Sequence, residues 1–275
     1  MANEAAIQPV VVGIDGSEAA VTAALWAVDE AVDRDVPLRL VYATGATSQP
    51  CQAPYFANDI AVEYGETCLR AASSIVAATG KTVKTETEIL WGEVEPRLIA
   101  ESRSAAMLCV GSVGIDWFAG RVLGSTAAAM SESARCPVAV VRYPRTLHPG
   151  KQTPWIVVGV DDRDGADELM GVAVDEARLR GAAVLAVTTQ SCPRSDPASA
   201  DLDLRLQVWR QSHQDVRIHQ VATDSGLSEF LVTNKAHFVE VVVLPADDAD
   251  QVPAIIGSHC RPQVPYGECS VMVVH

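Results

Sequence analysis

The stretch VVVGIDGSEAAVTAALWAVDEA, residues 10–31, returns later in the chain as IVVGVDDRDGADELMGVAVDEA, residues 156–177. Each copy begins with an apolar run that ends in Gly-x-Asp, continues through a polar turn, and closes with a helical pattern that ends in Asp-Glu-Ala. Gly13 corresponds to Gly159 and Asp15 to Asp161, at the same spacing. A repeat of this length indicates two tandem copies of one folding unit.

Further apolar runs recur in the same order through both halves. A run of about four to eight apolar residues between turn signals is typical of a buried strand. The paired runs are 37–44 with 182–189, 84–90 with 217–223, 106–111 with 239–244, and 137–142 with 270–274. Helical patterns separate the strands of the first half, over residues 18–34, 58–79, 94–102 and 125–134.

The regular alternation of strands and helices determines the fold class. It predicts parallel strands joined by right-handed crossovers. We therefore expect an α/β protein with two doubly wound domains, each built on a five-stranded parallel sheet of the Rossmann-like type. Ser17 and Ser125 are the expected N-caps of the helices that follow the first and the fourth strand.

The segment YPRTLHPGKQTP, residues 143–154, contains three prolines and a glycine and has no apolar periodicity. It is predicted to be the linker between the domains. The expected domains are residues 1–145 and 154–275.

Composition narrows the class of protein and of partner. The chain has 275 residues, of which 48% are hydrophobic, and a net charge of −14. Such acidity disfavours nucleic-acid binding, because the phosphate backbone would be repelled. No apolar run is long enough to span a membrane, and no signal peptide is evident, so a cytoplasmic location is expected. The seven cysteines include no C-x-x-C pair, which argues against a zinc site or a disulfide framework.

Two loops combine features that suit a nucleotide. Ligands of open parallel sheets bind beyond the carboxyl ends of the strands. The first strand ends at GIDGS, residues 13–17, and the fourth ends at GSVG, residues 111–114. The segment Gly124-Ser125-Thr126 then opens a helix, whose N–H groups and dipole favour phosphate. Asp15 can accept hydrogen bonds from a ribose or from an adenine amino group. Taken singly, these features are also ordinary turns and helix caps.

Other nucleotide and catalytic motifs are missing from the sequence. No G-x-x-x-x-G-K-[ST] occurs, and no G-x-G-x-x-G follows the first strand. The sequence also lacks G-x-S-x-G and H-E-x-x-H.

The string GSVGIDWFAGRVLGST, residues 111–126, resembles the nucleotide loop of the universal stress protein family. It meets the pattern G-x2-G-x9-G-[ST], and the flanking motifs VVVGIDGS and CPVAVVR also resemble that family. The likeness covers the chain as two copies and is similar to tandem dormancy-associated proteins of actinobacteria. It implies an adenine nucleotide alpha hydrolase-like fold, with ATP, alone or with Mg²⁺, between the first and fourth strands.

The resemblance also implies roles for individual residues. Asp15 would contact the adenosine portion, Ala43 would border the adenine, and the glycines and hydroxyls of the loop would line the phosphates. The implied nucleotide-binding residues are Gly13, Ile14, Asp15, Gly16, Ala43, Gly111, Ser112, Gly114, Arg121, Gly124, Ser125 and Thr126. The resemblance further implies dimerisation through the last strand of each domain. We therefore expect a homo-oligomer or an intrachain pseudo-dimer, with a regulatory protein partner that is not identified.

The sequence departs from the family pattern in both domains. Many relatives carry a basic or polar residue where this chain has Val113, although Arg121 lies in the same loop. Counting back from Gly257-Ser258 places Leu244 and Asp247 where glycines are expected. The carboxylates of Asp247, Asp248 and Asp250 would repel a triphosphate, so the second loop is predicted to be degenerate.

Three functions remain open from the sequence. The first is an ATP-binding regulatory factor of a dormancy or hypoxia-type stress response, with ATP in the first domain only and no turnover. The second is a slow ATPase or nucleotidyl transferase, for which Arg121 and Asp116 would be the groups nearest the phosphates. The third is an interaction module without a ligand, in which Trp117 and Phe118 could serve a partner.

Overall fold

The computed structural model describes residues 7–45, 55–114, 123–142, 153–161, 165–189, 197–233, 238–257 and 269–275. The chain divides into two compact units, residues 1–143 and 144–274. The predicted linker, residues 143–154, lies outside the described residues except for its last two positions.

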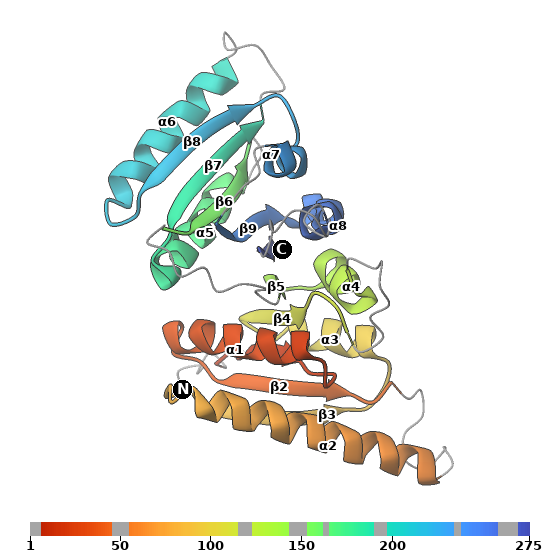
Figure 1. The fold of residues 1–275 in the computed structure, drawn as a ribbon. Helices are drawn as coiled ribbons and strands as arrows, with labels where there is room; N and C mark the ends of the chain where they lie inside the picture. Colours follow the sequence, from red (N-terminus) through yellow and green to blue (C-terminus); the bar gives the residue numbers. More distant parts are fainter. Residues whose placement is uncertain are drawn as a thin grey trace, which may run out of the picture. The chain divides into compact units, whose positions relative to one another are not determined.

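The first unit alternates strands with helices along its whole length (Figure 1). Its five parallel strands lie in the order β3-β2-β1-β4-β5. The elements are β1 (Val10–Gly13), α1 (Glu18–Asp33), β2 (Leu38–Ala43), α2 (Tyr55–Ala78), β3 (Thr85–Leu90), α3 (Val94–Ser102), β4 (Met107–Gly111), α4 (Ser125–Ser133) and β5 (Val138–Val141). Helix α1 packs against α2, and α3 packs against α4.

The second unit repeats this topology. Its parallel strands lie in the order β8-β7-β6-β9-β10, which corresponds strand by strand to the order of the first unit. The elements are β6 (Trp155–Val160), α5 (Ala166–Arg180), β7 (Ala183–Thr189), α6 (Pro197–Ser212), β8 (Ile218–Thr223), α7 (Leu227–Thr233), β9 (Val239–Pro245), η1 (Ala246–Gln251), α8 (Val252–Gly257) and β10 (Ser270–Val274). The predicted α/β fold with two doubly wound parallel sheets is confirmed.

Burial explains which segments became central strands. Val10, Val11 and Val12 of β1 are completely buried, as strands with helices on both faces require. The edge strand β3 instead reads TETEIL and keeps two exposed positions. Helix α1 turns a face of small residues toward the sheet, formed by Ala20, Ala23, Ala24, Ala27 and Ala31. These small side chains let the helix approach the strands closely.

A buried ion pair recurs in the two units. Glu30 is fully buried and pairs with Arg34 one turn later in the chain. Glu176 and Arg180 take the same places at the end of α5, with 2.9 Å between Arg180 Nε and Glu176 Oε2. The Asp-Glu-Ala signature of the repeat therefore contains a glutamate that each unit buries against its own arginine.

One of the two predicted N-caps is confirmed and the other is wrong. The Ser17 side chain accepts a hydrogen bond from the N–H of Ala20, 3.1 Å away, and caps α1. For α4 the N-cap is Gly124, and Ser125 is already the first helical residue. The Gly124 N–H donates to the Ser112 carbonyl oxygen at 2.8 Å, which fixes residue 124 as the last extended position before the helix.

We predict that Arg180→Met lowers the free energy of unfolding of the second unit by about 3 kcal/mol, because the substitution leaves Glu176 buried without its cation. Urea denaturation followed by circular dichroism measures this loss. Arg178→Met on the same helix is the matched control, since its pairs with Asp175 and Asp215 are exposed to water. Equal shifts of the urea midpoint in the two variants would contradict the prediction.

Candidate functional site

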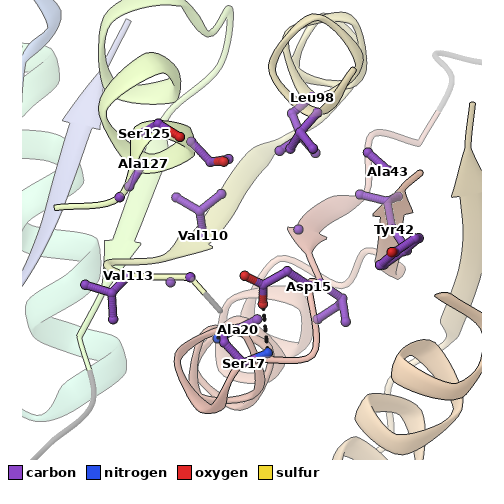
Figure 2. A pocket seen from close by; sticks show the side chains of 18 of the residues that line it. Asp15, Ser17, Ala20, Tyr42, Ala43, Leu98, Val110, Val113, Ser125 and Ala127 are labelled. Carbon is purple, nitrogen blue, oxygen red and sulfur yellow. Dashed lines mark hydrogen bonds between the residues drawn. The ribbon is translucent and has the colours of Figure 1, made fainter. Parts of the chain in front are cut away.

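A cavity of about 410 Å³ opens at the carboxyl ends of β1, β2 and β4 (Figure 2). Strand β1 lies between β2 and β4, and the chain leaves β1 and β4 toward opposite sides of the sheet. Such a switch point is the usual ligand position of an open parallel sheet. The cavity volume lies within the range typical of small-molecule sites.

Most of the residues predicted for the site line this cavity. They are Gly13, Ile14, Asp15, Ala43, Gly111, Gly114, Gly124, Ser125 and Thr126. Gly16 and Ser112 do not line it. Gly16 lies against α2, and Ser112 is buried, with its backbone bonded to Gly124 and Val141. Arg121, together with Asp116, Trp117 and Phe118, lies outside the described residues.

Among the described residues that line the cavity, Asp15 is the one with a charged side chain. Its Oδ1 accepts a hydrogen bond from the Ser17 N–H at 2.8 Å, so the turn after β1 fixes the carboxylate (Figure 2). A Cβ placed on Gly114 would lie 2.9 Å from Asp15 Oδ2. The second carboxylate oxygen therefore lies directly beside the loop that follows β4, where it can accept hydrogen bonds from a ligand.

The start of α4 forms the opposite side of the cavity, where Ser125 and Ala127 are labelled in Figure 2. The sequence analysis counted Gly124 among the residues whose N–H groups favour phosphate, but the Gly124 N–H donates to the Ser112 carbonyl oxygen. The N–H groups of Ser125, Thr126 and Ala127 belong to the first helical turn, which lacks intrahelical acceptors. They carry the positive end of the helix dipole and can bind an anion.

The two glycines after β4 have different roles. A Cβ on Gly111 would lie 2.7 Å from the backbone carbonyl carbon of Ala19, so this glycine lets α1 pack against the strand end. The sequence interpretation, that Gly111 admits a ligand, missed this contact. Among the described residues, a Cβ on Gly114 would meet the Asp15 carboxylate alone. Gly114 therefore contributes to the cavity, whereas the main role of Gly111 is to let the start of α1 pack against the end of β4.

Apolar side chains complete the wall on the side of α3. Val94 and Leu98 of α3 and Val110 of β4 line the cavity. Sequence reasoning missed these residues because they follow ordinary helix and strand patterns and carry no reactive group. Tyr42, at the end of β2, also lines the cavity, and burial is the main cause that raises the pKa of its phenol. The wall thus combines one carboxylate, one helix start and an apolar side.

Residues 6–142 match the family model described as "Universal stress protein family". A universal stress protein of Mycobacterium tuberculosis strain H37Rv is 40% identical, over 99% of this chain and 98% of its own length. The chain belongs to the universal stress protein family. The resemblance stated from the loop motif is thereby confirmed.

Two solved structures of universal stress proteins illustrate the likeness. One from Archaeoglobus fulgidus is 16% identical, with a TM-score of 0.71 over 97% of this chain and 95% of that chain, and shows the fold. Another, solved in complex with cAMP, is 29% identical and covers 50% of this chain and 97% of that chain, with a TM-score of 0.40. Within the described residues, no helix is long and apolar enough to cross a membrane, and no group of three or more metal-ligating side chains is found.

The equivalent edge of the second universal stress protein unit is built differently. The strand registers place Pro245 of β9 at the position of Gly111, because Val10 pairs with Met107 in the first unit and the corresponding Ile156 pairs with Val241 in the second. Leu244, which the sequence placed there, corresponds to Val110 and is buried like it. Helix η1 follows the strand immediately, and Gly257 is the last residue of α8. Counting back from Gly257 therefore used the wrong register, because the connection from strand to helix is shorter here. In residues 238–257 the strand ends at Leu244 and Pro245 without the glycines of the first unit.

We predict that Gly111→Ala destabilises the first unit by roughly 1–3 kcal/mol, because the added methyl meets the backbone of α1, which cannot move aside on its own. In the part of the chain that the structure describes, the methyl of Gly114→Ala meets a single side-chain oxygen, so this variant is expected to leave the urea midpoint nearly unchanged. Chemical denaturation of both variants measures the difference. An equal or larger loss of stability in Gly114→Ala would show that the packing role assigned to Gly111 is wrong.

Proposed function

We propose that the first unit binds ATP, alone or with Mg²⁺, and that the protein acts in a stress response as a nucleotide-dependent regulatory factor without turnover. The observation that carries the proposal is the cavity itself, in which the Asp15 carboxylate and the start of α4 lie on different walls. This arrangement offers an acceptor for the hydroxyl groups of a ribose and a donor set for phosphate within one site.

The adenosine end of the ligand is assigned to the side of β2 and α3. Val94 and Leu98 offer an apolar surface to a base, and Ala43 leaves space beside them. Asp15 Oδ1 is occupied by the Ser17 N–H, whereas Oδ2 faces the loop after β4. A ribose hydroxyl that donates to Oδ2 would gain a charge-assisted hydrogen bond.

The phosphate end is assigned to the start of α4. Backbone N–H groups of Ser125, Thr126 and Ala127 and the two hydroxyls are the donors there. The described lining residues include no lysine or arginine. Neutralisation of the phosphates by these residues therefore relies on N–H groups and the helix dipole, and Mg²⁺ would supply further positive charge when it is bound with the nucleotide.

Binding without turnover is favoured by the chemistry of the wall. Phosphoryl transfer requires a group that positions the nucleophile and positive charge at the transferred phosphate. Among the described lining residues, Asp15 is the single carboxylate, and no histidine is present. We therefore assign the site to reversible occupancy, which would change the surface formed by the loop after β4.

The second unit is proposed not to bind the nucleotide. The Pro245 ring stands where the first unit has Gly111, and Asp247 and Asp248 lie in the first turn of η1. Carboxylates at a helix start neutralise the dipole that would otherwise attract phosphate, and they repel a triphosphate directly.

Isothermal titration with ATP and Mg²⁺ tests the proposal. The wild-type protein is expected to bind, and Asp15→Asn is expected to weaken binding roughly 10- to 100-fold, because it removes an ionised acceptor. Asparagine retains an oxygen for the Ser17 N–H, so the turn is preserved. Asp161→Asn, at the corresponding position of the second unit, is the matched control and should bind like wild type.

A phosphate-release assay on the same samples tests the absence of turnover. Affinity that is unchanged in Asp15→Asn, or an affinity loss in Asp161→Asn of equal size, would contradict the assignment of the site. Steady release of phosphate that Asp15→Asn abolishes would contradict binding without turnover.

A further inference from the structure

Gly65 lies in the interior of α2 and is buried. A Cβ at this position would lie 2.4 Å from Tyr42 Cδ1, 2.8 Å from Cε1 and 3.0 Å from Cγ. The Tyr42 ring therefore occupies the volume that any other residue at position 65 would need. Glycine weakens a helix relative to alanine, so α2 loses local stability at a position that lies against the Tyr42 ring.

Helix α2 also contacts the turn that holds Asp15. A Cβ on Gly16 would lie 2.7 Å from Tyr64 Oη and 2.8 Å from Cys68 Sγ, and Gly16 has a φ of +91°. The Tyr64 hydroxyl donates to the Asp15 carbonyl oxygen at 3.4 Å. The rings of Tyr42 and Tyr64 meet edge to face, with centroids 6.1 Å apart. One face of α2 thus supports two parts of the cavity wall, Tyr42 and the Asp15 turn.

We propose that Gly65 is a positioning residue for the nucleotide site of the first unit. By leaving room for the Tyr42 ring, it lets α2 lie close to the ends of β1 and β2 and keeps the cavity at its observed width. The inference rests on the proposed function, since it concerns the affinity of the same site, and it adds a residue that does not line the cavity.

The distance between a methyl group at position 65 and the Tyr42 ring would have to increase by about 1 Å to reach an ordinary contact distance. Either the ring turns away from α2, which narrows the cavity that Tyr42 lines, or α2 moves outward and draws Tyr64 and Cys68 off the Asp15 turn. Both movements change the wall that a nucleotide contacts. Neither movement is needed when the Tyr42 ring is absent.

The test is a double-mutant cycle of Gly65→Ala and Tyr42→Ala, measured as ATP affinity by isothermal titration. Gly65→Ala alone is expected to weaken binding about tenfold or more. In the Tyr42→Ala background the same change should have little further effect, because the conflicting ring is gone. A general disturbance of α2 would instead weaken binding equally in both backgrounds.

Gly171→Ala is the matched control for the helix itself. Gly171 lies inside α5, and a Cβ there would meet no atom of the described residues within 4 Å. It should raise the melting temperature by roughly 2–4 °C, as a glycine-to-alanine change in a helix does, and leave ATP affinity unchanged.

Each outcome of the titrations has one meaning. Wild-type affinity in Gly65→Ala, or equal losses in both backgrounds of the cycle, would overturn the role of Gly65 while leaving the proposed function intact. A wild-type protein that does not bind ATP would overturn the proposed function and this inference with it. Loss in Gly65→Ala that Tyr42→Ala removes supports both.

Discussion

The contact between Gly111 and the backbone of Ala19 is the constraint on which the site depends. It brings the end of β4 against the first turn of α1, where a side chain of any size would hold the two apart. The turn that precedes α1 carries Asp15, and the loop that follows β4 carries Gly114. Close packing at Gly111 therefore places the Asp15 carboxylate beside Gly114, a loop residue without a side chain. The cavity opens next to this pair.

The two units show how one fold keeps its core while its loops diverge. Each retains the strand order and the buried glutamate that pairs with an arginine one turn later, as Glu30 and Glu176 do. At the strand end beside the site, however, Gly111 in the first unit corresponds to Pro245 in the second. The connection that follows is shorter and begins with a 3-10 helix. Stability requires the core in both units, whereas the open strand end is found in the first.

Sequence reasoning could predict the fold because each strand is a short apolar run and each helix has its own periodicity. The predicted α3, residues 94–102, matches the structure residue by residue. The site was harder to derive, because motifs reveal which residues are special but not what they contact. Gly111 was recognised as special, yet its partner Ala19 is an ordinary alanine of a helix. The Ser125 cap was misplaced by one residue because the bond from Gly124 to Ser112 is not visible in the pattern.

Other features left no sequence signal. Val94 and Leu98 form an apolar wall only because the crossover returns α3 to the edge of the cavity. From the sequence, Gly65 is only a residue that destabilises a helix, and its contact with the Tyr42 ring is seen only in the structure. In the second unit, counting from Gly257 failed because it assumed a loop of equal length. Contacts between segments distant in sequence, and changes in loop length, are the information that the pattern of residues does not carry.

We propose that each chain has one nucleotide site, which lies in the first unit. The most direct measurement is to purify the protein under native conditions, saturate it with ATP and Mg²⁺, remove unbound ligand, denature it, and quantify the released nucleotide by mass spectrometry. We predict one ATP per chain, recovered intact. Two per chain would show that the second unit binds as well, and no nucleotide would show that the cavity beside Asp15 has another purpose.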